Sequence, residues 1–242
     1  MPQRRRVLSG REGFWSKERD VTAFVLVRCG KVFKKGLKGG GSFGKVYFMK
    51  VRDLIHTSPM EYLVFERASE TKHEYYEGEV SAMAGASMAH NHIVVNVIRE
   101  VGNLLKGKRC MILPSDMRTC TPTETAYMYP DALVVCGEPE MADDRFDTLK
   151  NPVVIFEVLS PSTRDHDRQK KFHFYKQIPS FREYILIDSV TPFVEIHRRQ
   201  QMDLWNAEAT ADPGGHFFIS SIRHGVLMEE IYRNVKFPSV KP

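Results

Sequence analysis

The chain has 242 residues, of which 42% are hydrophobic, and it carries 35 Lys and Arg against 30 Asp and Glu. This length and composition are those of a globular protein with one large domain or two small ones. The hydrophobic content is high enough to form a buried core, which excludes a protein that is too polar to fold. No apolar run approaches the roughly 18 residues of a membrane-spanning helix, and no secretory signal is evident, so we expect a cytoplasmic protein without membrane contact.

The first 48 residues hold most of the positive charge. They contain 12 Lys and Arg against 3 Asp and Glu, a net charge of +9, whereas residues 49–242 carry a net charge of −4. Apart from short apolar runs at 21–27 and 46–48, this segment lacks strand or helix periodicity. We interpret residues 1–48 as a poorly ordered basic extension that can add non-specific phosphate affinity. The folded domain is expected to cover residues 49–242.

A glycine-rich run in this extension has the spacing of a kinase phosphate loop. Gly39, Gly41 and Gly44 followed by Val46 fit the pattern G-x-G-x-x-G-x-V. A kinase also needs an H-R-D-L-x-x-x-N loop and a D-F-G triplet, and the chain contains neither. An isolated glycine pattern is weak evidence for nucleotide binding, so we expect no organic cofactor.

The folded domain is expected to begin with a short helix and a hairpin. A Ser-Pro pair at 58–59 is a typical helix start, and the helix should end near Ala68. Residues 73–87 then indicate a hairpin that turns at Glu77-Gly78. The hairpin contains three carboxylates, those of Glu74, Glu77 and Glu79. Most carboxylates in such a hairpin lie on a solvated strand face.

The strongest helix signal in the chain covers residues 88–105. Apolar residues recur there every three or four positions over about 17 residues, as on the buried face of an amphipathic helix. His90 and His92 are two residues apart and do not share a helix face, which argues against a zinc site. His90 near the helix start could contact phosphate or the surroundings of a metal, although a capping or surface role is commoner for such a histidine.

Strands are expected next, with Asp131 beside one of them. Residues 110–113 and 117–120 form one extended segment in this interpretation, and a strand covers 126–135. Pro130 belongs at a strand start, an edge or a bulge, and a bulge would turn Asp131 toward a cleft. The four cysteines form no C-x-x-C pair, and Cys136 resembles a small buried hydrophobe, which suits a reducing compartment. Residues 138–150 are polar and are interpreted as a surface loop.

Residues 153–159 form an apolar run that is interrupted only by Glu157. Such a run predicts a central strand covered on both faces. An unpaired buried carboxylate costs several kcal/mol, so Glu157 is expected to face a metal ion or a cationic partner. A helix should begin near Arg164 or Asp165. On that helix Phe172, Tyr175 and Ile178 are expected to form the core side, with Asp167 and Lys171 adjacent on another side, where a surface ion pair is the simplest interpretation.

The C-terminal part is expected to consist of hairpins and a closing helical turn. The patterns predict a hairpin of 183–188 with 193–197, then a further pair of 202–205 with 216–222, and a helical turn at 228–232. The whole order of helices and strands around Asp131 and Glu157 is that of a restriction-endonuclease-like α/β core with a mixed sheet.

The residues themselves resemble the PD-(D/E)XK nuclease superfamily, and more closely its Uma-two family of restriction-type endonucleases. The motifs that carry the resemblance occur in family order: EYYEGEVSAMAGAS followed by a histidine, YPDALVVCGE, PVVIFEVLSPST, DRQKKFHFY and FREYILIDSVTPFVEIHRR. The resemblance runs from about Glu61 to the C-terminus and leaves residues 1–48 outside. These residues are either an accessory extension or lie upstream of a start at Met49 or Met60.

The chain departs from the superfamily pattern at one position. The motif calls for a lysine two residues after Glu157, where this chain has Leu159. The resemblance implies that the following helix supplies the cation instead, which points to Lys171, with Lys170 as the less favoured neighbour.

The resemblance implies a metal-dependent endonuclease that cleaves DNA. Asp131 and Glu157 would hold Mg²⁺ or Mn²⁺, and Lys171 would position water and stabilise charge on the phosphate. Glu79, His90 and Asp167 are possible additional site residues. The alternatives are a nuclease-like protein that only binds nucleic acid, and a structural protein that uses the helix at 88–105 as an interface. The groove for DNA must be locally basic, for which Arg118, Arg164, Arg168 and Lys171 are the candidates, or a second protomer of a homodimer must contribute to it.

Overall fold

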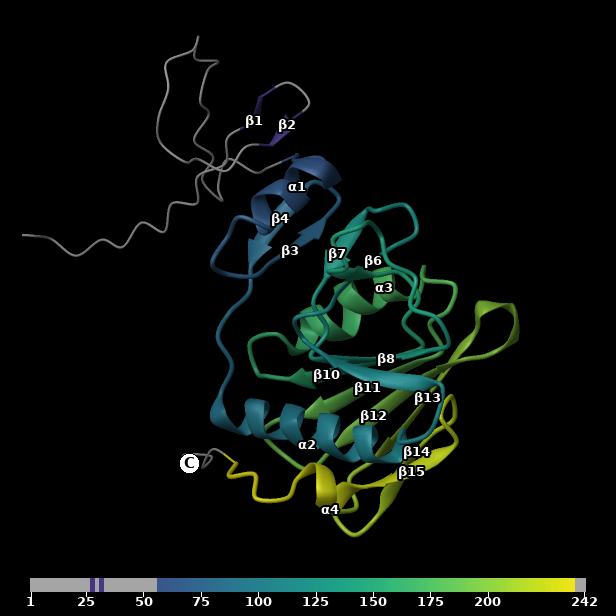
Figure 1. Cartoon of the computed structure of the whole chain (residues 1–242). Coiled ribbons are helices and arrows are strands. Elements are labelled where there is room, and N and C mark those ends of the chain that lie inside the picture. Colours follow the sequence, from purple (N-terminus) through teal and green to yellow (C-terminus); the bar gives the residue numbers. More distant parts are fainter. Residues whose placement is uncertain (1–26, 29–30, 33–55, 238–242) are drawn as a thin grey trace, which may run out of the picture.

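The computed structural model describes residues 27–28, 31–32 and 56–237. Most of residues 1–48, including the glycine-rich run, lie outside the described residues, and so do the predictions for them. Two short strands of this segment are described, β1 (Val27–Arg28) and β2 (Lys31–Val32), and they pair with each other. From residue 56 onward the helices and strands follow one another without a break in the description (Figure 1).

A six-stranded mixed sheet forms the centre of the domain. Its order is β13-β12-β11-β10-β8-β5, with β10 and β11 parallel and every other pair antiparallel. The strands are β5 (Cys110–Pro114), β8 (Ala132–Cys136), β10 (Val154–Leu159), β11 (Glu183–Asp188), β12 (Val194–Arg199) and β13 (Trp205–Thr210). All six residues of β10 are buried, as predicted for a central strand.

Alternation along β10 sends its side chains into two different cores. Val154, Phe156 and Val158 pack on the side covered by helix α2 (Met88–Leu104). Ile155 and Leu159 pack on the opposite side, which helix α3 (Phe172–Tyr175) covers (Figure 1). Glu157 has the same parity as Ile155 and Leu159 and therefore faces the α3 side.

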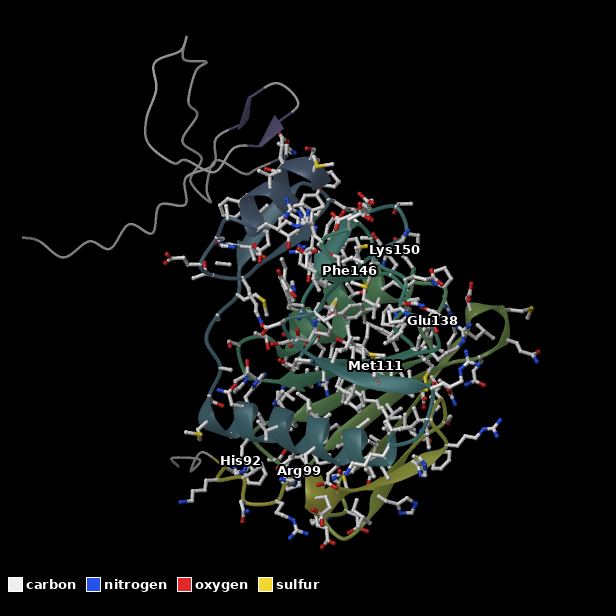
Figure 2. All side chains as sticks on the ribbon, in the orientation of Figure 1. His92, Arg99, Met111, Glu138, Phe146 and Lys150 are labelled. Carbon is white, nitrogen blue, oxygen red and sulfur yellow. A yellow bond between two sulfur atoms is a disulfide. The ribbon has the colours of Figure 1, made fainter. Side chains whose placement is uncertain are left out.

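Helix α2 matches the prediction in place and length. Ser87 caps it, and Ile93, Val97 and Val101 lie on its buried face. His92 and Arg99 lie on the side that faces away from the sheet (Figure 2). The hairpin of β14 (His216–Ile219) and β15 (His224–Leu227) and the helical turn α4 (Met228–Ile231) complete this core. No helix among the described residues is both long and apolar enough to cross a membrane.

A five-stranded sheet of order β4-β3-β7-β6-β9 lies above the α3 side of the central sheet (Figure 1). Its strands are β3 (His73–Tyr76), β4 (Glu79–Ala82), β6 (Arg118–Cys120), β7 (Ala126–Met128) and β9 (Thr148–Leu149). Helix α1 (Pro59–Glu66) packs against it and begins with a capping box between Ser58 and Glu61. The predicted hairpin turn is present, with positive φ at both Glu77 and Gly78.

Several predicted strands are divided differently between the two sheets. The predicted strand at 126–135 is two strands, because the chain leaves β7 in one sheet and enters β8 in the other, with no bulge at Asp131. The predicted segment at 110–120 likewise splits into β5 and β6. The loop at 138–150 contains the buried strand β9, although Glu138, Phe146 and Lys150 are at the surface (Figure 2). Near the C-terminus, β13 pairs with β12, and β14 pairs with β15, so the predicted pairing of 202–205 with 216–222 is wrong.

Two cysteines are paired. Cys110 and Cys136 lie directly opposite each other on β5 and β8 and form a disulfide, whereas Cys120 is free and buried. The prediction of Cys136 as an unpaired hydrophobe is therefore wrong. Nothing in the spacing of these cysteines could show that the register of two antiparallel strands brings them together.

Candidate active site

The antiparallel pairing of β8 with β10 brings Asp131 and Glu157 together. Ala132 pairs with Phe156, so the next residues toward the site are Asp131 and Glu157. The Val158 backbone N–H donates to Oδ2 of Asp131 at 2.7 Å, which fixes that carboxylate against the neighbouring strand. Glu157 is 2% exposed, whereas Asp131 is only half-buried. Solvent thus reaches this carboxylate pair on the Asp131 side.

The segment after β10 carries Lys171 to the same place. Residues His166–Lys171 form a π-helix that continues into α3, a helix type that often marks functional sites. Nζ of Lys171 lies 3.1 Å from Oε1 of Glu157 and 3.6 Å from Oδ1 of Asp167. Both Asp167 and Lys171 are buried, so their interaction is not the surface ion pair that was the simplest interpretation. Lys171 is followed four residues later by Tyr175, whose hydroxyl donates to Oε1 of Glu157 at 2.8 Å.

The first hairpin contributes Glu74 to the cluster rather than Glu79. Oε1 of Glu74 lies 3.0 Å from Nζ of Lys171 and accepts from the Tyr129 backbone N–H, while Oε2 accepts from the Tyr76 hydroxyl at 2.8 Å. The Glu79 side chain is 72% exposed and pairs with Lys170. The choice of Glu79 is therefore corrected to Glu74. Glu74 stands in the run His-Glu-Tyr-Tyr of strand β3, which is buried throughout, and an acid within an aromatic run was the available signal.

His90 lies at the open side of the cluster. It is in the first turn of α2, where its backbone N–H donates to the side chain of Ser87. Its Nε2 lies 3.2 Å from Oδ2 of Asp131, and its Nδ1 is buried without a hydrogen-bond partner among the described residues. The imidazole therefore contacts the site through Asp131, and it is not a solvated surface histidine.

Burial and the surplus of acids decide the charge states in the cluster. Burial raises the pKa of Glu157 well above its usual range, and the negative charges of Asp131 and Asp167 add to this effect against the opposing influence of Lys171. Burial also raises the pKa of Asp167. Burial would raise the pKa of Glu74 as well, but Lys171, His166 and the Tyr129 N–H together lower it to about 2.

Lys171 keeps its charge at this site. Burial alone would lower its pKa, yet the carboxylates of Glu157 and Glu74 raise that pKa well above the usual range. A buried ammonium with such partners can stabilise negative charge but cannot accept a proton at neutral pH.

The oxygen atoms of this cluster fit a hard divalent cation that keeps several water ligands. Oδ1 of Asp131 and Oε2 of Glu157 accept no hydrogen bond from any described residue. Glu74, Glu157 and Asp167 lie within 3.6 Å of one lysine, and Asp131 lies beside Glu157, so acidic groups outnumber cations in the cluster. No group of three His, Cys, Asp or Glu side chains in residues 56–237 is arranged as a ready-made cage for a metal. Mg²⁺ is commonly held by one or two carboxylates and water, so the donor set suits Mg²⁺ or Mn²⁺ better than a fully protein-bound metal.

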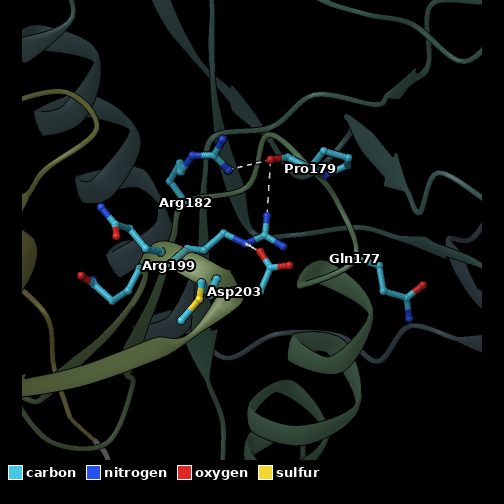
Figure 3. Close-up of a pocket in the computed structure, with 8 residues that line it drawn as sticks. Gln177, Pro179, Arg182, Arg199 and Asp203 are labelled. Carbon is cyan, nitrogen blue, oxygen red and sulfur yellow. Dashed lines mark hydrogen bonds and ion pairs between the residues drawn. The ribbon is translucent and has the colours of Figure 1, made fainter.

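A polar hollow of about 740 Å³ lies at the other end of the strands and shares no residue with this cluster (Figure 3). Arg182 and Arg199 donate there to the Pro179 carbonyl, and Arg199 also pairs with Asp203. Arg199 donates further to the carbonyl of Lys176 just beyond α3. These arginines hold the turn after α3, so the hollow has a structural explanation.

Comparisons with known proteins give a matching family, similar sequences and a solved structure of the same fold. A family model described as "Uma2: Putative restriction endonuclease" matches residues 59–221. Two uncharacterized proteins of Synechocystis sp. (strain ATCC 27184 / PCC 6803 / Kazusa) are similar: sll1609 is 37% identical over 139 residues, which cover 57% of this chain and 78% of that protein. The second, slr1290, is 32% identical over 183 residues, which cover 74% of this chain and 93% of that protein.

A solved structure shares the fold. It is titled as a "putative nuclease belonging to DUF820" from Anabaena variabilis ATCC 29413, with a TM-score of 0.59 and 18% identity. The match covers 72% of this chain and 96% of that one. The likeness confirms the predicted restriction-endonuclease-like α/β fold with its mixed sheet.

Proposed function

The chain belongs to the Uma2 family, whose description is that of restriction endonucleases, and on this premise we propose that it hydrolyses phosphodiester bonds of DNA with Mg²⁺ or Mn²⁺. Asp131 and Glu157 are the proposed metal ligands, and Lys171 is the proposed catalytic cation. The observation that carries the proposal is the convergence of these three side chains from β8, β10 and the π-helix, with Nζ of Lys171 3.1 Å from Oε1 of Glu157.

The residues have separate roles in the proposed reaction. Asp131 and Glu157 bind the metal, which supplies charge neutralisation at the phosphate and a lowered pKa for water. Lys171 stabilises the negative charge that develops on the phosphate, because its ammonium keeps its proton between the carboxylates. Glu74 and Tyr175 hold Lys171 and Glu157 in register through contacts of 3.0 and 2.8 Å. His90 orients the exposed end of the site through Asp131.

A second candidate function is a nuclease fold that binds nucleic acid and cleaves it slowly or not at all. Two observations favour it. Leu159 stands where the superfamily motif has its lysine, and Lys171 is buried and engaged by Glu157, Glu74 and Asp167. A cation held in this way must be partly released, or reached by the substrate, before it can act on a phosphate.

Supercoiled plasmid distinguishes the two candidates. Purified full-length protein is incubated with the plasmid in Mg²⁺, in Mn²⁺ or in EDTA, and nicked and linear forms are quantified. The nuclease proposal expects nicking that requires the metal and disappears in Glu157→Ala and Lys171→Met. The proposal fails if no metal supports nicking, or if nicking survives Glu157→Ala. Binding without nicking supports the second candidate. Sedimentation of the same sample shows whether the protein forms the homodimer that could complete the DNA groove.

A further inference from the structure

A DNA strand that approaches the cluster meets a surplus of negative charge. Three carboxyl groups contact the single Lys171 there and Asp131 lies beside them, and residues 56–237 as a whole carry 26 Asp and Glu against 20 Lys and Arg. One divalent cation offsets only part of this surplus. Binding of the phosphate backbone therefore requires cationic side chains at the rim of the cluster.

Two basic side chains lie at this rim, on the outer side of the π-helix that carries Lys171. The side chains of Lys170 and His166 are 41% and 36% exposed. Nζ of Lys170 lies 4.5 Å from the centre of the Tyr76 ring, and the His166 ring packs edge-on against the same ring. The Tyr76 hydroxyl in turn donates to Glu74 inside the cluster. The tyrosine thus holds both basic side chains next to the cluster. The Lys170 ammonium reaches solvent, whereas Nε2 of His166 lies 3.3 Å from the Tyr76 hydroxyl and 3.7 Å from Oε2 of Glu74.

Lys170 is available to exchange its partner. Its only ion pair among the described residues is with Glu79, at 3.6 Å and largely in solvent, and such surface pairs contribute little to stability. Two arginines of the same segment differ, because Arg164 is bound to the buried Asp188 at 2.6 Å and Arg168 to Glu195 at 2.7 Å. Lys170 can therefore turn to a phosphate at little cost.

We propose that Lys170, with His166 beside it, binds a backbone phosphate of the nucleic acid next to the bond that is cut. This inference rests on the proposed nuclease function and extends it to the way the substrate is held. A phosphate contact of this kind fixes the register of the strand but reads no sequence. The family resemblance had pointed to Lys171 as the catalytic cation, and the two neighbouring lysines now have different tasks: Lys171 faces inward to Glu157, and Lys170 faces outward to the strand.

The test compares two lysines of one helical segment in the full-length protein. Lys176 also lies over an aromatic ring, 4.9 Å from the centre of Phe172, but that ring stacks on Tyr184 and not on Tyr76. Binding of a short fluorescein-labelled DNA duplex is followed by anisotropy in EDTA between about 50 and 200 mM salt. Lys170→Gln should lower the slope of log K against log salt by about 0.9, and the affinity about eightfold near 0.1 M salt, as expected for one lost phosphate contact. Lys176→Gln should leave both unchanged, and Lys170→Arg should restore them.

Each outcome decides the inference. A smaller salt slope in Lys170→Gln alone, with a weaker loss in the same direction for His166→Gln, supports the phosphate contact. Equal slopes for Lys170→Gln and Lys176→Gln overturn it, as does wild-type protein that binds no duplex at low salt. The nuclease proposal is judged separately by plasmid nicking. If nicking depends on Glu157 but Lys170→Gln and Lys176→Gln have equal salt slopes, only the phosphate contact of Lys170 is rejected. If the salt slope depends on Lys170 but no nicking occurs, only the nuclease proposal is rejected.

Discussion

Replacement of Glu74 by glutamine tests whether this carboxylate holds the centre of the site. The change preserves the size of the side chain and removes the charge that pairs with Lys171 at 3.0 Å. A pKa lowered from 4.5 to about 2 corresponds to about 3 kcal/mol of stabilisation at neutral pH. Loss of one partner from a buried ion pair costs about 3 to 5 kcal/mol, which agrees. Glu74→Gln should therefore unfold about 6 to 12 °C below the wild type, at about 2 to 4 °C per kcal/mol for a domain of this size.

The pH dependence of this difference has a definite sign. Because the folded-state pKa of Glu74 lies below its ordinary value, its contribution is complete above pH 4.5 and is lost as the pH falls through about 2. Urea unfolding of wild type and Glu74→Gln at a series of pH values measures the gap. Glu79→Gln is the matched control, because this exposed acid of the same hairpin should change stability by less than about 0.5 kcal/mol. A Glu74→Gln protein as stable as Glu79→Gln, or a gap that does not narrow in acid, would refute the reasoning.

Three further predictions concern metal, disulfide and core. Mg²⁺ or Mn²⁺ at 100 times its dissociation constant should stabilise the wild type by about 2.7 kcal/mol and leave Glu157→Ala unchanged in thermal unfolding; equal stabilisation of both proteins would contradict the assigned ligands. Cys110→Ser, which opens a disulfide spanning 26 residues, should cost about 3 to 4 kcal/mol in urea unfolding without reductant and nothing after reduction. Arg118→Met should cost about 3 to 5 kcal/mol, because Asp147 and the Tyr129 hydroxyl lose a buried partner; a smaller change by calorimetry would show that apolar packing replaces it.

Local patterns were sufficient for helix α2, which buries one face, and for strand β10, which is buried on both faces. Helix α2 and strand β10 were predicted in place, because an apolar stripe with a period of three to four residues, or an unbroken apolar run, reports burial directly. The division of the strands between two sheets was not predictable in this way. Residues 126–135 contain one long apolar pattern, and only the tertiary packing shows that Pro130 lies where the chain passes from β7 to β8.

The sequence singled out Asp131 and Glu157 but not Glu74, and the difference has a physical reason. Asp131 and Glu157 were recognised because an acid within or beside a buried strand must be compensated, and their roles as metal ligands stay predictions. Glu74 obeys the same rule within the buried strand β3, but the hairpin offered three acids, and the pattern alone did not tell which face of the hairpin is covered. The interaction of Cys110 with Cys136 depends on strand register, which the cysteine spacing does not encode.

Leu159 and Lys171 occupy different positions relative to Glu157, and the difference explains why the proposed cation comes from the helix and not from β10. Leu159 lies two residues beyond Glu157 on the same face of β10, and it is fully buried in the core on the α3 side, where a lysine would lose its hydration.

Lys171 reaches the same carboxylate from the helix that covers this face. Its spacing contains the signal: Asp167, Lys171 and Tyr175 follow one another at intervals of four residues along the π-helix and α3, and all three are buried. Phe172 is half-buried and packs against the core on the α3 side, as predicted, where its ring stacks on Tyr184. A lysine on the core face of a helix, opposite an acid on the core face of a strand, is therefore the pattern on which the proposed site rests.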